Sequence, residues 1–176
     1  MASRPPLTDA IIVALSRLVD DSQTDKREPS HSDIEFQIDR AQLAAADPGR
    51  QGKPVGKSKR VRGTLSWALS NNLPAGETLA AGLIATVQGY GGFRPESTNY
   101  CGADAIANLA SALALQGWEL TSDGSLQPRV LASLSGRELT SALRAYARRA
   151  QQGSLDSPLL AGTAKDLLEA TAAHVL

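Results

Sequence analysis

Apolar residues recur at three- and four-residue steps in several stretches of the chain, which is the spacing of one buried helix face. The first stretch predicts a helix that begins at Thr8 or Asp9, because either side chain can cap a helix N-terminus, and ends near Val19. The residues expected to face inward are Ile11, Ile12, Leu15 and Leu18.

A second helix is predicted to follow a polar loop. Ser32 and Glu35 have the spacing of a capping box, so we expect the helix to start there and to run to about Ala46, where Asp47-Pro-Gly ends it. The inward face would hold Ile34, Ile38, Ala41 and Ala45.

The middle of the chain predicts two more helices, at 58–71 and 77–88, with a turn at 71–76 between them. The second of these is apolar almost all round, which is typical of a central helix. In the first we expect the inward residues Val61, Leu65, Trp67, Ala68 and Leu69.

Glycines and aromatic residues interrupt the helical pattern at 89–101, which predicts an ordered loop before a helix at 103–116. Asp123-Gly124 then lies between short alternating runs, the pattern of a two-stranded hairpin near 118–126. Pro128 is expected to begin a short helix to Leu134, and a capping box at 135–138 predicts a longer one to about Gln152.

The terminal segment, 154–176, predicts one broad apolar helix face behind the capping residues Asp156 and Ser157. A helix with such a face needs a partner, either earlier in the chain, in a second copy or in further polypeptide. We expect a homodimer contact through 157–176 as one solution. The stripe consists of Leu160, Ala164, Leu167, Thr171 and Val175.

Together these elements predict a mainly α protein, a bundle of six to eight helices with one short β-hairpin. Aromatic residues make up only 4% of the chain, which disfavours a sandwich or barrel. The expected organisation is a helical N-terminal domain at 1–152, followed by a separate terminal helix at 154–176. The N-terminal domain divides into a two-helix segment (1–47), a basic loop (48–57) and a helical core with the hairpin (58–152).

Composition narrows the functional classes. The formal net charge is zero, so no global field attracts nucleic acid or membranes. Cys101 is the only cysteine, which excludes an intrachain disulfide and a cysteine-built metal site and fits a reducing cytoplasm. No apolar stretch reaches the length of a membrane span. We expect a cytoplasmic protein without a membrane partner.

The segment from Arg50 to Arg62 is the strongest local charge feature. Its side chains are candidates for contact with nucleic-acid phosphates, RNA included, because such contacts depend mainly on charge density. The alternative is a solvated loop whose charge is offset by the acidic segment at 20–39. The candidate contacts are Lys53, Lys57, Lys59, Arg60 and Arg62.

Other patterns carry little chemistry. Gly89-Tyr-Gly-Gly lacks the Lys of a P-loop and is interpreted as a helix end, and Arg144, Arg148 and Arg149 as a basic ridge near a helix C-terminus. His31 is expected near a helix N-cap and Cys101 as a buried thiol. His31 and His174 have no metal-ligand spacing. We therefore predict no catalytic residue, no metal site and no cofactor.

Four segments resemble bacterial abortive-infection family proteins: 61–65 (VRGTL), 91–100 (GGFRPESTNY), 120–128 (LTSDGSLQP) and 162–170 (GTAKDLLEA). The resemblance covers most of the chain after Val61, and 165–169 is its most specific part. The positions that match family motifs are Arg94, Tyr100, Lys165 and Glu169.

The resemblance implies phage defence by growth arrest, with a C-terminal helical domain of the HEPN class that cleaves RNA. That class carries an arginine and a histidine with four to six residues between them. This chain has no such pair, because only three residues separate Arg27 from His31 and no arginine after Arg149 precedes His174. The resemblance implies that 154–176 is the first helix of a truncated C-terminal domain. We therefore expect the non-catalytic regulatory part of such a protein, sensing RNA or a phage-derived trigger. The alternatives are a complete interaction module, dimerising or toxin-inhibiting, and a nucleic-acid-binding domain that uses 50–62.

Overall fold

The computed structural model describes residues 4–22, 27–52, 54–128 and 144. Within these ranges the chain is mainly helical with one antiparallel hairpin, as predicted, and the described helices number five rather than six to eight. The helices expected at 135–152 and 154–176 lie outside the described residues, Arg144 excepted. The elements are α1 (Asp9–Leu18), α2 (His31–Arg40), η1 (Ala44–Ala46), η2 (Pro48–Arg50), α3 (Lys57–Asn71), α4 (Leu73–Gly89), α5 (Ala103–Ala114), β1 (Trp118–Leu120) and β2 (Leu126–Pro128).

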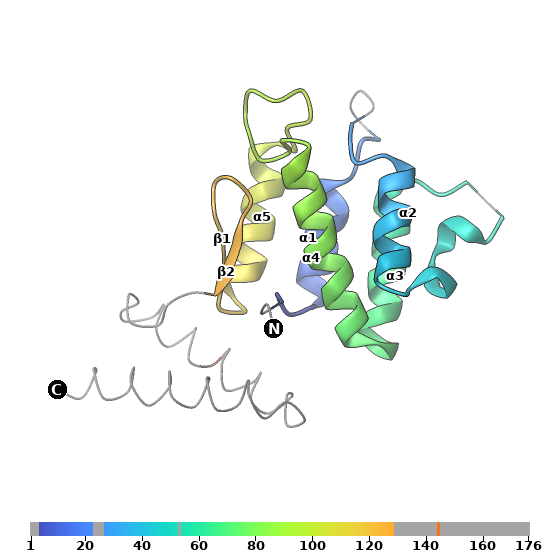
Figure 1. Cartoon of the computed structure of the whole chain (residues 1–176). Coiled ribbons are helices and arrows are strands. Elements are labelled where there is room, and N and C mark those ends of the chain that lie inside the picture. Colours follow the sequence, from blue (N-terminus) through green and yellow to red (C-terminus); the bar gives the residue numbers. More distant parts are fainter. Residues whose placement is uncertain (1–3, 23–26, 53, 129–143, 145–176) are drawn as a thin grey trace.

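The helices form two layers (Figure 1). Helices α4 and α2 lie in front, and α1, α3 and α5 lie behind them, with α1 between its two neighbours. Helix α1 contacts α3, α5 and α4, so it is the central helix of the back layer. Its inner face is therefore covered by α4, and its outer face lies between α3 and α5.

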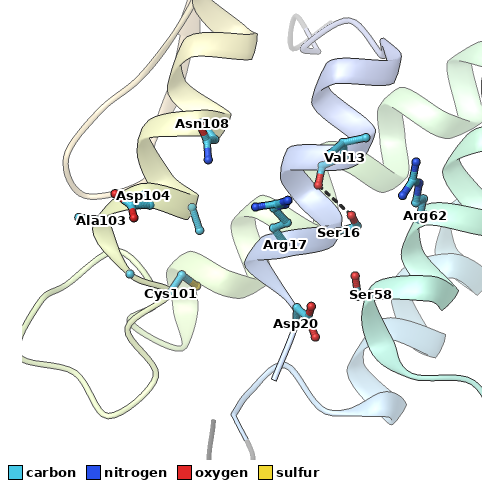
Figure 2. Close-up of a pocket in the computed structure, with 12 residues that line it drawn as sticks. Val13, Ser16, Arg17, Asp20, Ser58, Arg62, Cys101, Ala103, Asp104 and Asn108 are labelled. Carbon is cyan, nitrogen blue, oxygen red and sulfur yellow. Dashed lines mark hydrogen bonds between the residues drawn. The ribbon is translucent and has the colours of Figure 1, made fainter. Parts of the chain in front are cut away.

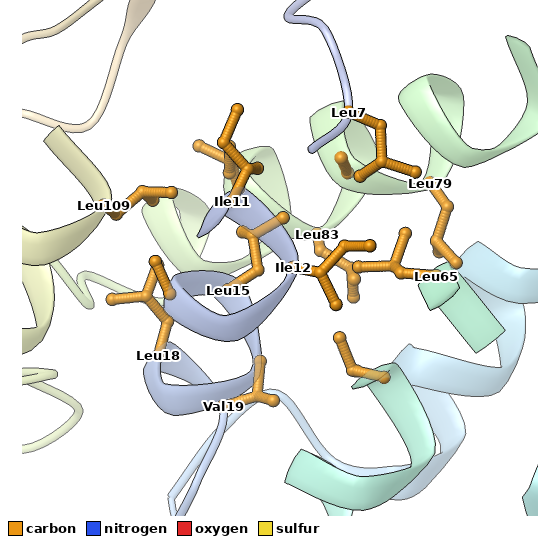
Figure 3. Packing of buried hydrophobic residues seen from close by; sticks show 14 of the residues in the cluster. Leu7, Ile11, Ile12, Leu15, Leu18, Val19, Leu65, Leu79, Leu83 and Leu109 are labelled. Carbon is orange, nitrogen blue, oxygen red and sulfur yellow. The ribbon is translucent and has the colours of Figure 1, made fainter. Parts of the chain in front are cut away.

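The core is built around the inner face of α1 (Figure 3). The predicted N-cap is confirmed, since the Thr8 hydroxyl accepts a hydrogen bond from the Ile11 N–H. All of the residues predicted to face inward from this helix are buried, and each contributes about 1.5–3 kcal/mol through burial. They pack with Leu65 of α3, Leu79 and Leu83 of α4, and Leu109 of α5.

The predicted limits of the second helix are wrong. The capping box is formed by Ser30 and Asp33, two residues before the predicted pair, and α2 already ends at Arg40. The backbone turns at Gln42, whose φ of 60° lies in the left-handed region. That turn lets Leu43 pack into the core, while Ala45, which was expected inside, is exposed. Burial of one leucine thus outweighed two further helical turns.

Helices α3 and α4 meet without the predicted turn. Asn72 ends α3 and also caps α4, accepting a hydrogen bond from the Ala75 N–H, and Pro74 occupies the first turn, where its missing N–H costs nothing. Gly76 makes the close approach possible, because a Cβ there would lie 3.0 Å from the Ala68 Cβ. Trp67, expected to face inward, is 45% exposed.

The glycine-rich loop after α4 folds back on the helix end. Gly91, with φ 76°, carries the chain out of the helix, and the Gly92 N–H donates to the Val87 carbonyl. Phe93 is buried, as expected of an ordered loop.

The predicted hairpin is also confirmed. Strands β1 and β2 pair with Trp118 opposite Pro128. Pro128 therefore belongs to strand β2, and the other residues of the short helix predicted to run to Leu134 lie outside the described residues. Trp118 is buried, which fixes the hairpin to the helical core.

Candidate functional site

Arg60, one of the predicted nucleic-acid contacts, is buried in an ion pair. Its Nε and Nη2 donate to the two carboxylate oxygens of Asp47 at 2.8 and 2.5 Å, and Nη1 donates to the His31 carbonyl at 3.0 Å. The side chain of Arg60 is 6% exposed and that of Asp47 is 0% exposed. Burial would raise the pKa of Asp47, but the hydrogen bonds and charge of Arg60 outweigh it and hold that pKa below its ordinary value. This arginine joins α3 to η2 and α2.

Lys57 is buried in the same way. Its Nζ lies 2.6 Å from an Asp21 carboxylate oxygen and donates to the Arg27 carbonyl at 2.6 Å. Its side chain is 3% exposed, against 22% for Asp21. Burial again acts to raise the pKa of Asp21, and the bonds from Lys57 and from the Arg27 N–H lower it below its ordinary value. Lys57 thus anchors the loop that follows α1.

The predicted basic surface is therefore not a continuous patch. Lys53 lies outside the described residues, and Arg50 pairs with Glu35 at 2.9 Å and Asp39 at 2.7 Å, so the predicted offset by the acidic segment applies to this arginine. Of the predicted contacts, only Lys59 and Arg62 are described as exposed. For Lys57 or Arg60 to contact nucleic acid, its side chain would have to leave a buried ion pair.

Helix geometry explains this division. Residues advance by about 100° around a helix, so positions two apart lie on nearly opposite sides. Lys57, Arg60 and Thr64 share the side of α3 that faces the interior, and Lys59 and Arg62 take the other side. A count of charges along the sequence therefore treats two different surfaces of α3 as one.

Arg62 instead borders a cavity of about 580 Å³ over the outer face of α1 (Figure 2). Val13, Ser16 and Arg17 of α1, and Asp20 just after this helix, form the middle of the cavity. It lies between α3 and the start of α5. The flanking residues are Ser58 and Arg62 of α3, and Cys101, Gly102, Ala103, Asp104, Ala105 and Asn108 at and after the start of α5.

Two guanidinium groups, those of Arg17 and Arg62, line this cavity. Both residues are exposed, and neither side chain has a hydrogen-bonded or ion-pair partner among the described residues. The cavity also meets the N-terminus of α5, where Gly102 provides no side-chain cap. Backbone N–H groups at a helix start favour anions. The carboxylates of Asp20 and Asp104 balance the formal charge of the site.

A second cavity, of about 600 Å³, continues along α1 and α5 and is mostly apolar. Val13, Arg17 and Asn108 line both cavities, so the two form one groove along the outer face of α1. We call the two parts the charged half and the apolar half of the α1 groove. The remaining residues of the apolar half are Asp9, Ala10, Ala14, Ser111, Ala112 and Leu115.

The two described family-motif positions, Arg94 and Tyr100, do not line this groove. Arg94 is exposed in the loop after α4, and Tyr100 is half-buried, with its carbonyl accepting a hydrogen bond from Arg27 at 3.1 Å. Lys165 and Glu169 lie outside the described residues, as do Arg148, Arg149 and His174.

The isolated histidine and cysteine have structural positions. His31 is the first residue of α2, next to the N-cap as expected. The thiol of Cys101 is buried, and burial raises its pKa. Across the described ranges, no group of three His, Cys, Asp or Glu side chains is placed to hold a metal ion. None of the helices there has the length and apolarity of a membrane span.

Arg17 is the site residue that sequence reasoning missed. Its only sequence signal is that Asp9, Val13 and Arg17 recur at four-residue steps, which places them on the outer face of one helix. Nothing in the sequence indicates that this face lies beside Arg62. Protein-family models, curated proteins and solved structures all yielded no match to this chain. Its function is therefore inferred from the groove.

Proposed function

We propose that the described part of the chain is a recognition domain that binds a nucleotide in the charged half of the α1 groove, either as a free nucleoside monophosphate or as the 5′-phosphorylated end of an RNA. The observation that carries this proposal is the pair Arg17 and Arg62, which line one cavity without partners among the described residues. Arginine binds phosphate well, because its planar donors match two phosphate oxygens at once.

Three other arginines have partners within the protein. The guanidinium of Arg60 is paired with Asp47, that of Arg50 with Asp39, and that of Arg27 donates to three backbone carbonyls. Arg17 and Arg62 differ from these arginines in lining a cavity that also meets a helix N-terminus. A phosphate there would receive charge-assisted hydrogen bonds from side chains and backbone N–H groups.

The remaining polar groups favour a nucleotide over a bare anion. Asp20, Asp104 and Asn108 supply oxygen acceptors, which suit ribose hydroxyls and base amino groups. The cavity volume of about 580 Å³ falls in the range of small-molecule sites. Phosphate and hydrogen-bond donors on one ligand match the two signs of charge in the cavity.

The resemblance to abortive-infection proteins gives this domain a role. A regulatory domain that binds a nucleotide or an RNA end would sense a trigger of infection and control an RNA-cleaving toxin domain. The domain would thus have both the regulatory role and the nucleic-acid contact that the sequence predicts. That contact would lie in the α1 groove and not in the 50–62 segment.

Binding to the full chain tests the proposal. Isothermal titration with AMP, adenosine and inorganic phosphate, and fluorescence anisotropy with 5′-phosphorylated and 5′-hydroxyl RNA, separate the two sources of the ligand. Arg17→Ala and Arg62→Ala should each weaken binding about tenfold or more, the value of one charge-assisted hydrogen bond. Lys59→Ala is the matched control, because Lys59 is exposed on α3 but does not line the cavity.

Asp104→Asn separates a nucleotide from a simple anion. Removing this negative charge should strengthen binding of inorganic phosphate, but weaken nucleotide binding if the carboxylate accepts from the ligand. No binding of AMP or phosphorylated RNA at millimolar concentration would refute the proposal, and so would an equal loss in the Lys59→Ala control.

A further inference from the structure

The apolar half of the α1 groove exposes large hydrophobic side chains that the nucleotide proposal does not use. Leu115, at the C-cap of α5, is 60% exposed, and Val13 on α1 is 37% exposed. Alanines at 10, 14 and 112 lie around them and leave a shallow cavity of about 600 Å³. Covering such a surface stabilises a protein in proportion to the apolar area removed from water. A phosphate-bearing ligand would not cover it.

The chain passes close to this surface as it leaves the described part. Pro128 pairs with Trp118 across the hairpin, and Trp118 follows Leu115 by three residues. Three residues reach at most about 11 Å, and paired strands add about 5 Å. Pro128 therefore lies within about 16 Å of Leu115, and the chain continues from there to 176.

We infer that the terminal segment 154–176 of the same chain docks as an amphipathic helix on the apolar half of the α1 groove. The stripe from Leu160 to Val175 spans about 22 Å of helix, which is long enough to cover the apolar half, where α1 contributes Asp9 to Arg17 over about 12 Å. The intervening residues, 129–153, are far more than the distance requires. Helix-in-groove docking of this kind uses apolar residues at three- and four-residue steps.

The docked segment would border the proposed ligand site. Val13, Arg17 and Asn108 line both halves of the groove, so a helix on the apolar half lies against the same side chains as a ligand in the charged half. The groove would then connect ligand binding to the position of the chain that follows. The docking itself does not depend on the nucleotide proposal, because the two rest on different halves of the groove.

Disulfide mapping in the full chain tests the docking. In a Cys101→Ser background, which removes the only native cysteine, Leu115→Cys is combined in turn with cysteine at a stripe position or at a polar-flank position. A disulfide needs Cα atoms within about 7 Å, so Leu115→Cys can reach only the nearest stripe position of a docked helix. Intrachain disulfides, measured by gel mobility and mass after mild oxidation, should form at least tenfold faster from one stripe position than from either flank position. The stripe positions are Leu160, Ala164, Leu167 and Thr171, and the flank positions are Lys165 and Glu169.

Phe36→Cys replaces Leu115→Cys in the matched control, because Phe36 is 63% exposed on α2 and does not line the groove. Equal rates from Leu115→Cys and Phe36→Cys, or from stripe and flank, would overturn the docking. Disulfides formed only between chains would assign the segment to the groove of a second copy and overturn the intrachain proposal. Since no ligand is added, these outcomes leave the AMP and RNA titrations as a separate test of the nucleotide site.

Discussion

Arg60 and Arg62 stand two residues apart on one helix and have opposite environments. Arg60 lies in the interior, bonded to Asp47 and the His31 carbonyl, whereas Arg62 is exposed at the α1 groove. The first arginine holds elements together, and the second is available to a ligand. The function of a charged side chain therefore depends on which face of the helix it occupies, and not on the charge density of its segment.

The largest effect should come from breaking the buried pair. Arg60→Met leaves the Asp47 carboxylate buried without its main partner, so the free energy of unfolding should fall by about 3–5 kcal/mol, as measured by urea denaturation. Adding Asp47→Asn should recover part of this loss, because the uncompensated charge is removed. An Arg60→Met protein with unchanged stability would contradict the structural role of this arginine.

A smaller loss is expected from Lys57→Met. Asp21 is 22% exposed, so water can hydrate its carboxylate after the lysine is removed. We expect a loss of about 1–3 kcal/mol in the same measurement. If Lys57→Met cost more than Arg60→Met, the ranking of the two pairs by burial would be wrong.

The pH dependence of stability gives a second test of the buried pair of Arg60 and Asp47. The pKa of Asp47 is lowered in the folded protein, so its contribution is present above the unfolded pKa, near pH 4, and is lost as the pH falls through the folded pKa. In Arg60→Met, burial should raise the folded pKa of Asp47 above the unfolded one. The cost of the substitution should then shrink as the pH is lowered from 7 to 4.

Unfolding curves of both proteins at several pH values would show this as a converging difference, of about 1.4 kcal/mol for each unit by which the pKa rises. Asp47→Asn in both backgrounds is the control, since the convergence should disappear without the carboxylate. A difference that stays constant from pH 7 to pH 4 would mean that Asp47 is not the group left uncompensated.

The smallest effects on stability should come from the exposed side of α3. Arg62→Met and Lys59→Met should each change the free energy of unfolding by less than about 0.5 kcal/mol, because both residues are exposed and no described residue pairs with their side chains. A loss from Arg62→Met that approaches that of Arg60→Met would remove the distinction between the two arginines.

Much of the fold was predictable, because helix caps and apolar periodicity act over a few residues. Thr8 as the cap of α1, the inward residues of that helix and the hairpin around Asp123-Gly124 all followed from local pattern. The errors lie where two local signals competed. Ser30 and Asp33 cap α2 in place of Ser32 and Glu35, and burial of Leu43 ends that helix early.

The candidate site was much less predictable. Arg62 was identified for its charge, and Arg17 was not identified, because their common cavity requires α1 to lie beside α3 and the start of α5. The basic segment was predicted as one surface, although Lys57 pairs with Asp21, 36 residues away in sequence, and Arg60 pairs with Asp47, 13 residues away. Long-range pairing of this kind leaves no periodic signal.

By itself, the sequence determined the helical class, the positions of most described helices and of the hairpin, and their apolar faces, since these depend on backbone propensities and on residues within a turn or two of each other. Only the tertiary structure decided which cations are buried and paired and which line a cavity. It did so because desolvation makes an unpaired buried charge costly, and the packing of α1, α3 and α5 determines where water is excluded.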